Sequence, residues 1–184
     1  MMRLFVAIDI NNQTVRSKLK RFQEELESSG ADLKLVELDN LHLTLRFIGE
    51  VKDSIVPTIA NKLSTITGNG FRIHLTGTGA FPNMDYPRVV WVGMGEGSNE
   101  AAAFRDAVNE ALSDIVGKDS DEFSPHITMA RVKSGRNKAK LIQAINEWQE
   151  ADFGWQDVNS IKLKKSTLTP RGPIYEDIYE VRLG

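Results

Sequence analysis

The chain has 184 residues, of which 41% are hydrophobic and 26% are charged, a composition typical of an ordinary globular domain that is large enough to bury a core. Its net charge of −2 argues against a protein that coats long nucleic acid, but it leaves room for recognition of a short oligonucleotide or of one terminus. The absence of cysteine excludes disulfides, thiolate catalysis and cysteine-based zinc sites.

The first half of the chain is predicted to alternate strands and helices. In chain order, we expect a buried strand over 3–10, a helix from Asn11 or Asn12 to about 28, a short strand over 33–37, a strand over 41–51 and a helix from Asp53 or Ser54 to about 68. The apolar run at the start is too short for a membrane span, and Asp9 interrupts it before any cleavage-like sequence. We therefore expect a first strand, a cytoplasmic protein and no association with a membrane.

The second half is predicted to repeat this pattern. We expect strands over 71–76 and 88–94 on either side of a turn-rich stretch, a helix over 99–116, a strand over 124–133, a helix over 137–149 and two closing strands over 158–168 and 174–183. A strand, a helix and a histidine-bearing strand followed by a helix occur over both 3–63 and 88–148. This pattern predicts a single bilobal domain over 1–184, with a repeat of roughly 1–87 and 88–184 whose two lobes face one cleft.

Two His-x-Thr tetrapeptides, His42–Leu45 and His126–Met129, lie within the two predicted histidine strands. Side chains alternate between the faces of a strand, so each histidine points the same way as its threonine, Thr44 or Thr128. A site facing both strands would hold two imidazoles and two hydroxyls. That combination predicts acid–base chemistry on a phosphate and requires no metal.

The remaining histidine, His74, also belongs to a His-x-Thr sequence. No comparable strand–helix unit surrounds it, and Gly77 is expected to end its strand at once, so we predict a structural or surface role. The chain also lacks the close histidine spacing or cysteine pairs typical of zinc sites, which argues against a metal.

Two arginines are candidates for binding the phosphate. Arg131 follows His126 by five positions, and strict alternation places it on the opposite face unless the strand twists or bulges there. Arg46 is in phase with His42 and is the second candidate.

At this point the chain resembles the two-histidine (2H) phosphoesterases, and most closely the RNA 2′,3′-cyclic phosphodiesterases once called 2′-5′ RNA ligases. The hallmark of that family is the pair of His-x-Thr/Ser-x motifs. The surrounding segments that also resemble the family are Arg3–Ile8, Leu41–Leu45, Phe47–Glu50, Ser124–Thr128, Ala130–Val132, Lys165–Leu168 and Gly172–Tyr175.

The resemblance implies a bilobal α+β fold in which two antiparallel sheets face a central cleft and helices pack outside. It also implies hydrolysis of RNA 2′,3′-cyclic phosphate ends to 2′-phosphomonoesters, with His42 as proton donor, His126 as proton acceptor, and Thr44, Thr128 and Arg131 binding the substrate. The residues alone cannot assign the two histidine roles, because the pseudo-symmetry exchanges two chemically equal groups.

We expect no cofactor, no metal and a monomer, with an RNA or oligonucleotide bearing a 2′,3′-cyclic phosphate end as the partner. Run in reverse, the same chemistry could join a 2′-phosphate-derived end to a 5′-hydroxyl, which would be a reversible 2′-5′ RNA ligation. Two alternatives stay open: a phosphodiesterase for small cyclic nucleotide phosphates, and a non-catalytic binder of RNA ends.

Overall fold

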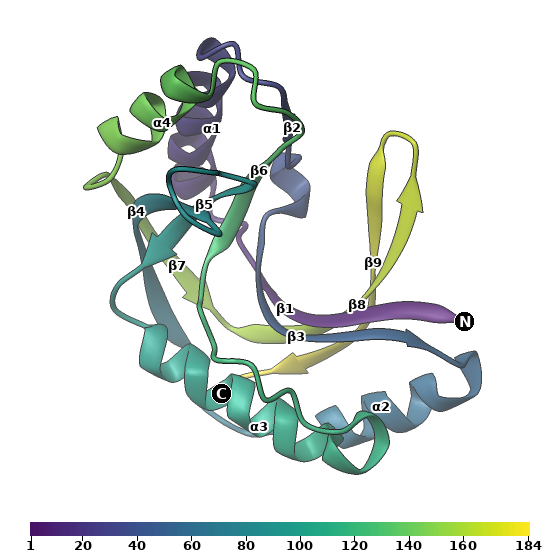
Figure 1. Ribbon diagram of the computed structural model, residues 1–184. Helices are drawn as coiled ribbons and strands as arrows, with labels where there is room; N and C mark the ends of the chain where they lie inside the picture. Colours follow the sequence, from purple (N-terminus) through teal and green to yellow (C-terminus); the bar gives the residue numbers. More distant parts are fainter.

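A curved antiparallel sheet forms the body of the protein, and helices pack outside it (Figure 1). The computed structural model describes the whole chain, Met1–Gly184. The sheet has nine strands in the order β7-β4-β5-β6-β3-β1-β8-β9, with β2 paired to β6. All of the strand pairs are antiparallel.

The sheet consists of two halves, each of which takes strands from both halves of the chain. One half-sheet contains β1 (Met2–Asp9), β3 (His42–Val51), β8 (Ser160–Thr169) and β9 (Gly172–Arg182). The other contains β2 (Leu33–Leu35), β4 (Phe71–Phe81), β5 (Val89–Met94), β6 (Ile127–Val132) and β7 (Asp152–Val158).

The half-sheets join through a single residue pair between the two histidine strands, Leu43 opposite Ile127. The antiparallel α+β architecture that the sequence predicts is therefore confirmed, but the two expected sheets form one continuous sheet. Because Leu43 and Ile127 follow His42 and His126 directly, the same pairing brings both histidine sequences to one place.

The helices cover the outer faces of the two half-sheets. α1 (Gln13–Ser28) and α4 (Lys138–Glu147) lie side by side against β4, β6 and β7, whereas α2 (Val56–Leu63) and α3 (Ser98–Val116) pack together against β3 and β9 (Figure 1). Two short 3-10 turns, Leu38–Asn40 and Asp53–Ile55, precede β3 and α2. None of the helices combines the length and apolar character needed to cross a bilayer.

Helix α1 illustrates how the sequence sets these elements. Its start is fixed by the side chain of Asn12, which accepts a hydrogen bond from the backbone N–H of Val15. The apolar positions Val15, Leu19, Phe22 and Leu26 recur at helical spacing and are all buried in the core. The helix therefore belongs to the first sequence repeat but packs on the half-sheet that carries His126.

Strand β7 is an element that the sequence pattern did not predict. Gly154 has a φ of +98°, and the pairing with β4 skips a residue there, so the alternation of buried and exposed residues is broken. A polar side chain, Gln156, is buried where an apolar residue would be expected. Its amide oxygen accepts hydrogen bonds from the backbone N–H groups of Asn11 and Asn12, both at 2.9 Å, which explains how it is satisfied.

Candidate active site

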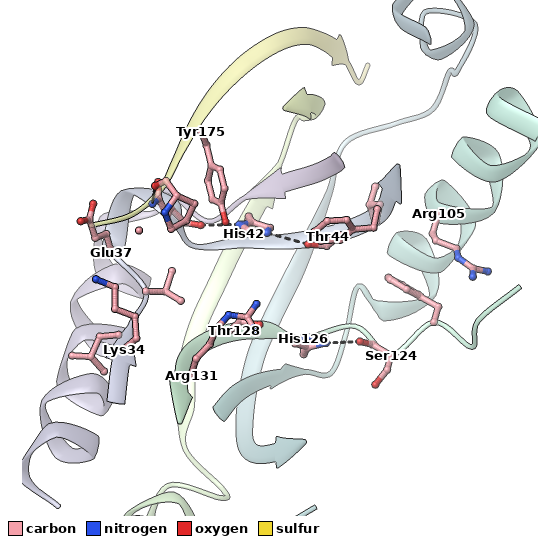
Figure 2. A pocket seen from close by; sticks show the side chains of 18 of the residues that line it. Lys34, Glu37, His42, Thr44, Arg105, Ser124, His126, Thr128, Arg131 and Tyr175 are labelled. Atoms are coloured by element: carbon pink, nitrogen blue, oxygen red, sulfur yellow. Dashed lines mark hydrogen bonds between the residues drawn. The ribbon is translucent and has the colours of Figure 1, made fainter. Parts of the chain in front are cut away.

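A pocket of about 480 Å³ lies where the two half-sheets meet, and residues from both halves line it (Figure 2). His42 and Thr44 from β3 line one side, while His126 and Thr128 from the β6 segment line the other. The structure thus brings together all four residues of the paired His-x-Thr motifs, as expected from side-chain alternation along two neighbouring strands.

The two histidine rings are held in the same way. The Nδ1 atom of His42 lies 2.7 Å from the backbone oxygen of Asn40, and Nδ1 of His126 lies 2.7 Å from that of Ser124. A carbonyl oxygen only accepts, so Nδ1 carries the hydrogen in each ring and donates it. In a neutral ring, the Nε2 atom is then the basic one, which leaves it available for proton transfer.

The Nε2 atom of His42 has a hydrogen-bond partner within the protein, whereas the only ring hydrogen bond of His126 is made by its Nδ1 atom. In His42 the Nε2 atom lies 3.0 Å from the Thr44 hydroxyl, which donates to it when the ring is neutral. Burial lowers the pKa of His42 below the ordinary value of 6.5, because desolvation disfavours the cation; Lys164 and His126 lower it further, while the Asn40 carbonyl and Asp9 oppose the shift.

Aromatic side chains pack against both rings. Phe5 is 2% exposed, and its ring centroid is 5.1 Å from that of His42 and 5.0 Å from that of Tyr175. Tyr175 itself meets His42 edge-on at 5.5 Å. On the other side of the pocket, Phe81 meets His126 edge-on at 4.8 Å. Phe5 is therefore part of the packing beneath His42 and does not line the pocket.

A bulge in β6 brings Arg131 to the pocket. In the pairing with β5, Val90 faces Ala130 and the next residue of β5 faces Thr128, so Met129 is an extra residue. Met129 and Ala130 are both fully buried, which shifts the alternation by one position. Arg131 consequently lines the pocket together with Thr128. A bulge of this kind is the condition under which the sequence pattern places Arg131 on the same face as His126.

A matching bulge in β3 takes Arg46 away from the pocket. The pairing with β1 skips Leu45, so Arg46 turns to the outer face and is only 6% exposed. Its guanidinium donates to the side chain of Asn109 and to the backbone oxygens of Val116 and Gly117 at the end of α3. The prediction that Arg46 faces the site was wrong, because strict alternation does not hold across a bulge.

His74 lies outside the pocket, on the β4–β7 pair. Its Nε2 atom is 2.8 Å from the carboxylate of Asp152, and its ring stacks on Trp155 at 4.7 Å. The expectation that Gly77 ends this strand was wrong, because β4 continues to Phe81 with Gly77 at a φ of +78°. No group of three or more His, Cys, Asp or Glu side chains lies close enough together to hold a metal ion.

Several pocket residues escaped the sequence prediction. Phe47 is 55% exposed and occupies the position in β3 that corresponds to Arg131 in β6. Lys34 and Arg171 line the pocket from β2 and from the β8–β9 turn. Tyr175 was marked only by its place in the family-like segment Gly172–Tyr175, because contacts between strands so far apart in sequence leave no local pattern.

Paired His-x-Thr strands at the junction of two antiparallel half-sheets define a two-histidine phosphoesterase. A family model described as LigT like Phosphoesterase matches the chain twice, over residues 8–91 and 92–175. The chain belongs to this family, and the double match agrees with the internal repeat.

Individual relatives resemble the chain over nearly its full length. An RNA 2′,3′-cyclic phosphodiesterase of Aeropyrum pernix is 43% identical over 166 residues, covering 90% of this chain and 94% of the relative. The protein of the same name from Methanocaldococcus jannaschii is 42% identical over 179 residues, covering 97% and 99%. The crystal structure of TT0787 from Thermus thermophilus is similar with a TM-score of 0.80 and 27% identity, covering 98% and 97%. The structure of E. coli LigT complexed with NADP+ has a TM-score of 0.78 at 23% identity, covering 99% and 98%, which supports the fold.

Proposed function

We propose that the protein hydrolyses RNA ends that carry a 2′,3′-cyclic phosphate and leaves a 2′-phosphomonoester and a free 3′-hydroxyl. A water oxygen attacks phosphorus while the bond from phosphorus to the 3′-oxygen breaks. The water gives a proton to one imidazole, and the other imidazole gives a proton to the departing 3′-oxygen. Each imidazole can serve in this way near neutral pH.

One observation carries the proposal: both His42 and His126 line the same pocket, and each holds its Nδ1 hydrogen on the carbonyl two residues earlier. Each Nε2 atom is thereby left for proton transfer to a group bound between the rings. The names of the Aeropyrum and Methanocaldococcus relatives support the choice of RNA 2′,3′-cyclic phosphate as the substrate.

We assign the proton donor to His42 and the proton acceptor to His126, as the family resemblance implies. A donor must be protonated when the substrate is bound, whereas burial lowers the pKa of His42 in the free protein. The negative charge of a bound phosphate would favour the cation and offset this lowering. Protonation of His42 is therefore expected to accompany substrate binding.

Thr44, Thr128 and Arg131 are proposed to bind the two free phosphate oxygens. The hydroxyls lie on the same strands as the histidines and line the same pocket. Hydrogen bonds of this kind strengthen as negative charge builds on the oxygens in the transition state. Binding of phosphate would take the Thr44 hydroxyl away from Nε2 of His42, its present partner.

The test is product analysis on an RNA that ends in a 2′,3′-cyclic phosphate, distinguishing a 2′- from a 3′-monoester. We expect the 2′-monoester, undiminished rates in excess chelator, and a loss of at least ~10²-fold for either His42→Ala or His126→Ala. Formation of the 3′-monoester would contradict the assignment of the leaving oxygen. Binding of the RNA without turnover would favour the alternative of a non-catalytic RNA-end binder.

The same site would join RNA ends if a 5′-hydroxyl took the place of water, because the attack on phosphorus and the loss of the 3′-oxygen are unchanged. The product would be a 2′–5′ phosphodiester. Incubation of the cyclic end with an excess of 5′-hydroxyl oligonucleotide measures this reaction.

We further propose that the protein acts in the cytoplasm as a monomer.

A further inference from the structure

Three cationic side chains gather at one end of the pocket. Lys34 and Arg131 stand directly opposite each other in the β2–β6 pairing, and Arg171 lies at the turn of the β8–β9 hairpin. The ammonium group of Lys34 donates to the backbone oxygen of Arg171 at 3.1 Å, so the hairpin turn and β2 are fastened together at this point. We call this group the basic end; Figure 2 shows Lys34 and Arg131 on the same side of the pocket.

No carboxylate neutralises the basic end. Lys34, Arg131 and Arg171 are all exposed, and none of them forms an ion pair. One carboxylate, that of Glu37, lines the same end without pairing with them. Like charges directly opposite on neighbouring strands are destabilising. Such an arrangement is explained if an anion binds there.

The opposite end of the pocket is acidic. Asp119, Asp121 and Glu122 line it from the loop that precedes His126, and none of them forms an ion pair with a cation. The guanidinium of Arg105, at this end in Figure 2, donates to the backbone oxygens of Asp119 and Asp121 and lies over the ring of Phe123. It also forms an ion pair with the carboxylate of Asp106 on α3, at 3.3 Å, so its charge and its hydrogen bonds are satisfied within the protein.

This separation of positive and negative charge between the two ends of the pocket fits the shape of a terminal nucleotide. In ribose, the base is attached to C1′, and C5′, whose oxygen carries the 5′-phosphate, is attached to C4′. The two substituents therefore leave the ring at opposite ends of the 2′,3′ edge. A cyclic phosphate held between the histidines would therefore direct the 5′-phosphate to one end of the pocket and the base to the other. An acidic end disfavours a phosphate, and a basic end favours one.

The number of cations in the pocket also indicates that more than one phosphate group binds there. A 2′,3′-cyclic phosphate is a diester with a single negative charge, and it would already meet two imidazoles, two hydroxyls and the guanidinium of Arg131. Beyond Arg131, the basic end holds Lys34 and Arg171 against the single carboxylate of Glu37. A second anionic group accounts for the cations that the reacting phosphate leaves unmatched.

We propose that Lys34 and Arg171, beside Arg131, form a subsite for the phosphodiester on the 5′ side of the terminal nucleotide. The inference rests on the proposed function and narrows its substrate: the enzyme prefers an oligonucleotide end to a mononucleoside cyclic phosphate. The RNA strand enters the pocket from the side of β2 and the β8–β9 hairpin, and its terminal base lies toward the loop that contains Phe123.

The experiment compares two substrates that share one terminal nucleoside: a ribonucleoside 2′,3′-cyclic phosphate with a 5′-hydroxyl, and the dinucleotide that adds one internal phosphodiester. The variants are Lys34→Gln, Arg171→Gln and their combination. Lys140→Gln is the matched control, because Lys140 is exposed on α4 outside the pocket and forms no ion pair.

We expect the wild type to favour the dinucleotide by at least about tenfold in kcat/KM. Each variant should lose roughly three- to tenfold on the dinucleotide through KM and should keep its rate on the nucleoside substrate. The fall in kcat/KM with rising salt concentration, measured on the dinucleotide, should be shallower in the variants than in the wild type, because fewer cations attract the phosphodiester. Equal losses on both substrates, no preference in the wild type, or an equal loss in Lys140→Gln would overturn the subsite.

Equilibrium binding separates this inference from the proposed function. The probe is a dinucleotide that ends in a 2′-phosphate, compared with the corresponding nucleoside 2′-phosphate. If the wild type turned over neither cyclic substrate, the proposed function would fail. The subsite would still be supported by weaker binding of the dinucleotide to Lys34→Gln than to Lys140→Gln, and it would be overturned by equal binding.

Discussion

Arg46 and Arg131 provide a direct test of the bulges in β3 and β6. Without bulges, Arg46 would face the pocket and Arg131 would face away; with them, the positions are reversed. We therefore expect Arg46→Met to reduce stability and Arg131→Met to reduce activity. Methionine keeps much of the length and apolar stem of arginine while removing its charge and its donors.

The size of the stability effect follows from the contacts of Arg46. Its guanidinium donates to the backbone oxygens of Phe47, Val116 and Gly117 at 3.0–3.3 Å and to the side chain of Asn109. At about 1 kcal/mol net for each hydrogen bond, with some compensation from the apolar replacement, the loss is about 3 kcal/mol. For a chain of this size, that corresponds to a fall in Tm of roughly 6–12 °C.

Arg131 should show the opposite behaviour. It is exposed and makes no hydrogen bond or ion pair within the protein, so Arg131→Met should change the free energy of unfolding by less than about 0.5 kcal/mol. If it binds the reacting phosphate, kcat/KM should fall by ~10²-fold.

Thermal unfolding and initial rates, measured well below both melting temperatures, give the two readouts. The rate of Arg46→Met should stay within about tenfold of the wild type, because that side chain does not line the pocket and reaches it only through the backbone of Phe47 and the loop anchored by Asn109. A stable but inactive Arg46→Met, or an unstable but active Arg131→Met, would refute the bulge-based placement of these side chains.

Three other predictions concern the histidines and their supports. Burial lowers the pKa of His42 below the 6.5 of an unfolded chain, so the unfolded state binds more protons and the free energy of unfolding should fall as the pH drops through 6.5. Urea unfolding of the wild type and of His42→Asn at pH 5 and pH 8 measures this effect. A difference in stability between the two proteins that is the same at both pH values would contradict it. His74→Ala should lower stability by about 1 kcal/mol, through the lost hydrogen bond and stacking, and leave kcat/KM intact; abolished activity would overturn the structural role of His74. The side-chain amide of Asn40 donates to the backbone oxygen of Pro173 in the β8–β9 hairpin at 3.3 Å, and Pro173 lines the pocket. Asn40→Ala should therefore raise KM. Ser124→Ala, at the equivalent position before His126, should have a much smaller effect in the same steady-state assay.

The paired motifs could be found from the sequence because they depend on short-range geometry. Within His42–Leu45 and His126–Met129 the strands alternate regularly, and local alternation is all that is needed to place each histidine beside its threonine. The internal repeat, and then the family resemblance, predicted that the two histidine strands face one cleft. The pairing of Leu43 with Ile127 that joins them has no local pattern in the sequence. The antiparallel α+β fold that the resemblance implies is confirmed, and the family model matches residues 8–91 and 92–175.

The failures have physical causes that lie outside local periodicity. Leu45 and Met129 are apolar residues like many others, and nothing in their identity marks them as the extra residues of bulges. The buried Gln156 in β7 depends on backbone groups about 145 positions away. Lys34 and Arg131 become neighbours only through the pairing of β2 with β6.

Identical motifs on a pseudo-symmetric fold have to serve an asymmetric reaction, since one imidazole must be charged when the other is neutral. A fully symmetric pocket would give both rings the same affinity for the proton and no preferred direction for the substrate. Here the equivalent positions after the two bulges differ: β3 presents the aromatic ring of Phe47, and β6 presents the cation of Arg131. Arg131 lies next to Lys34 in the basic end, and the half-buried ring of His42 packs against Phe5 and Tyr175. In the mechanism that we propose, the residues around the motifs, and not the motifs themselves, distinguish the two histidines and would orient the RNA end between them.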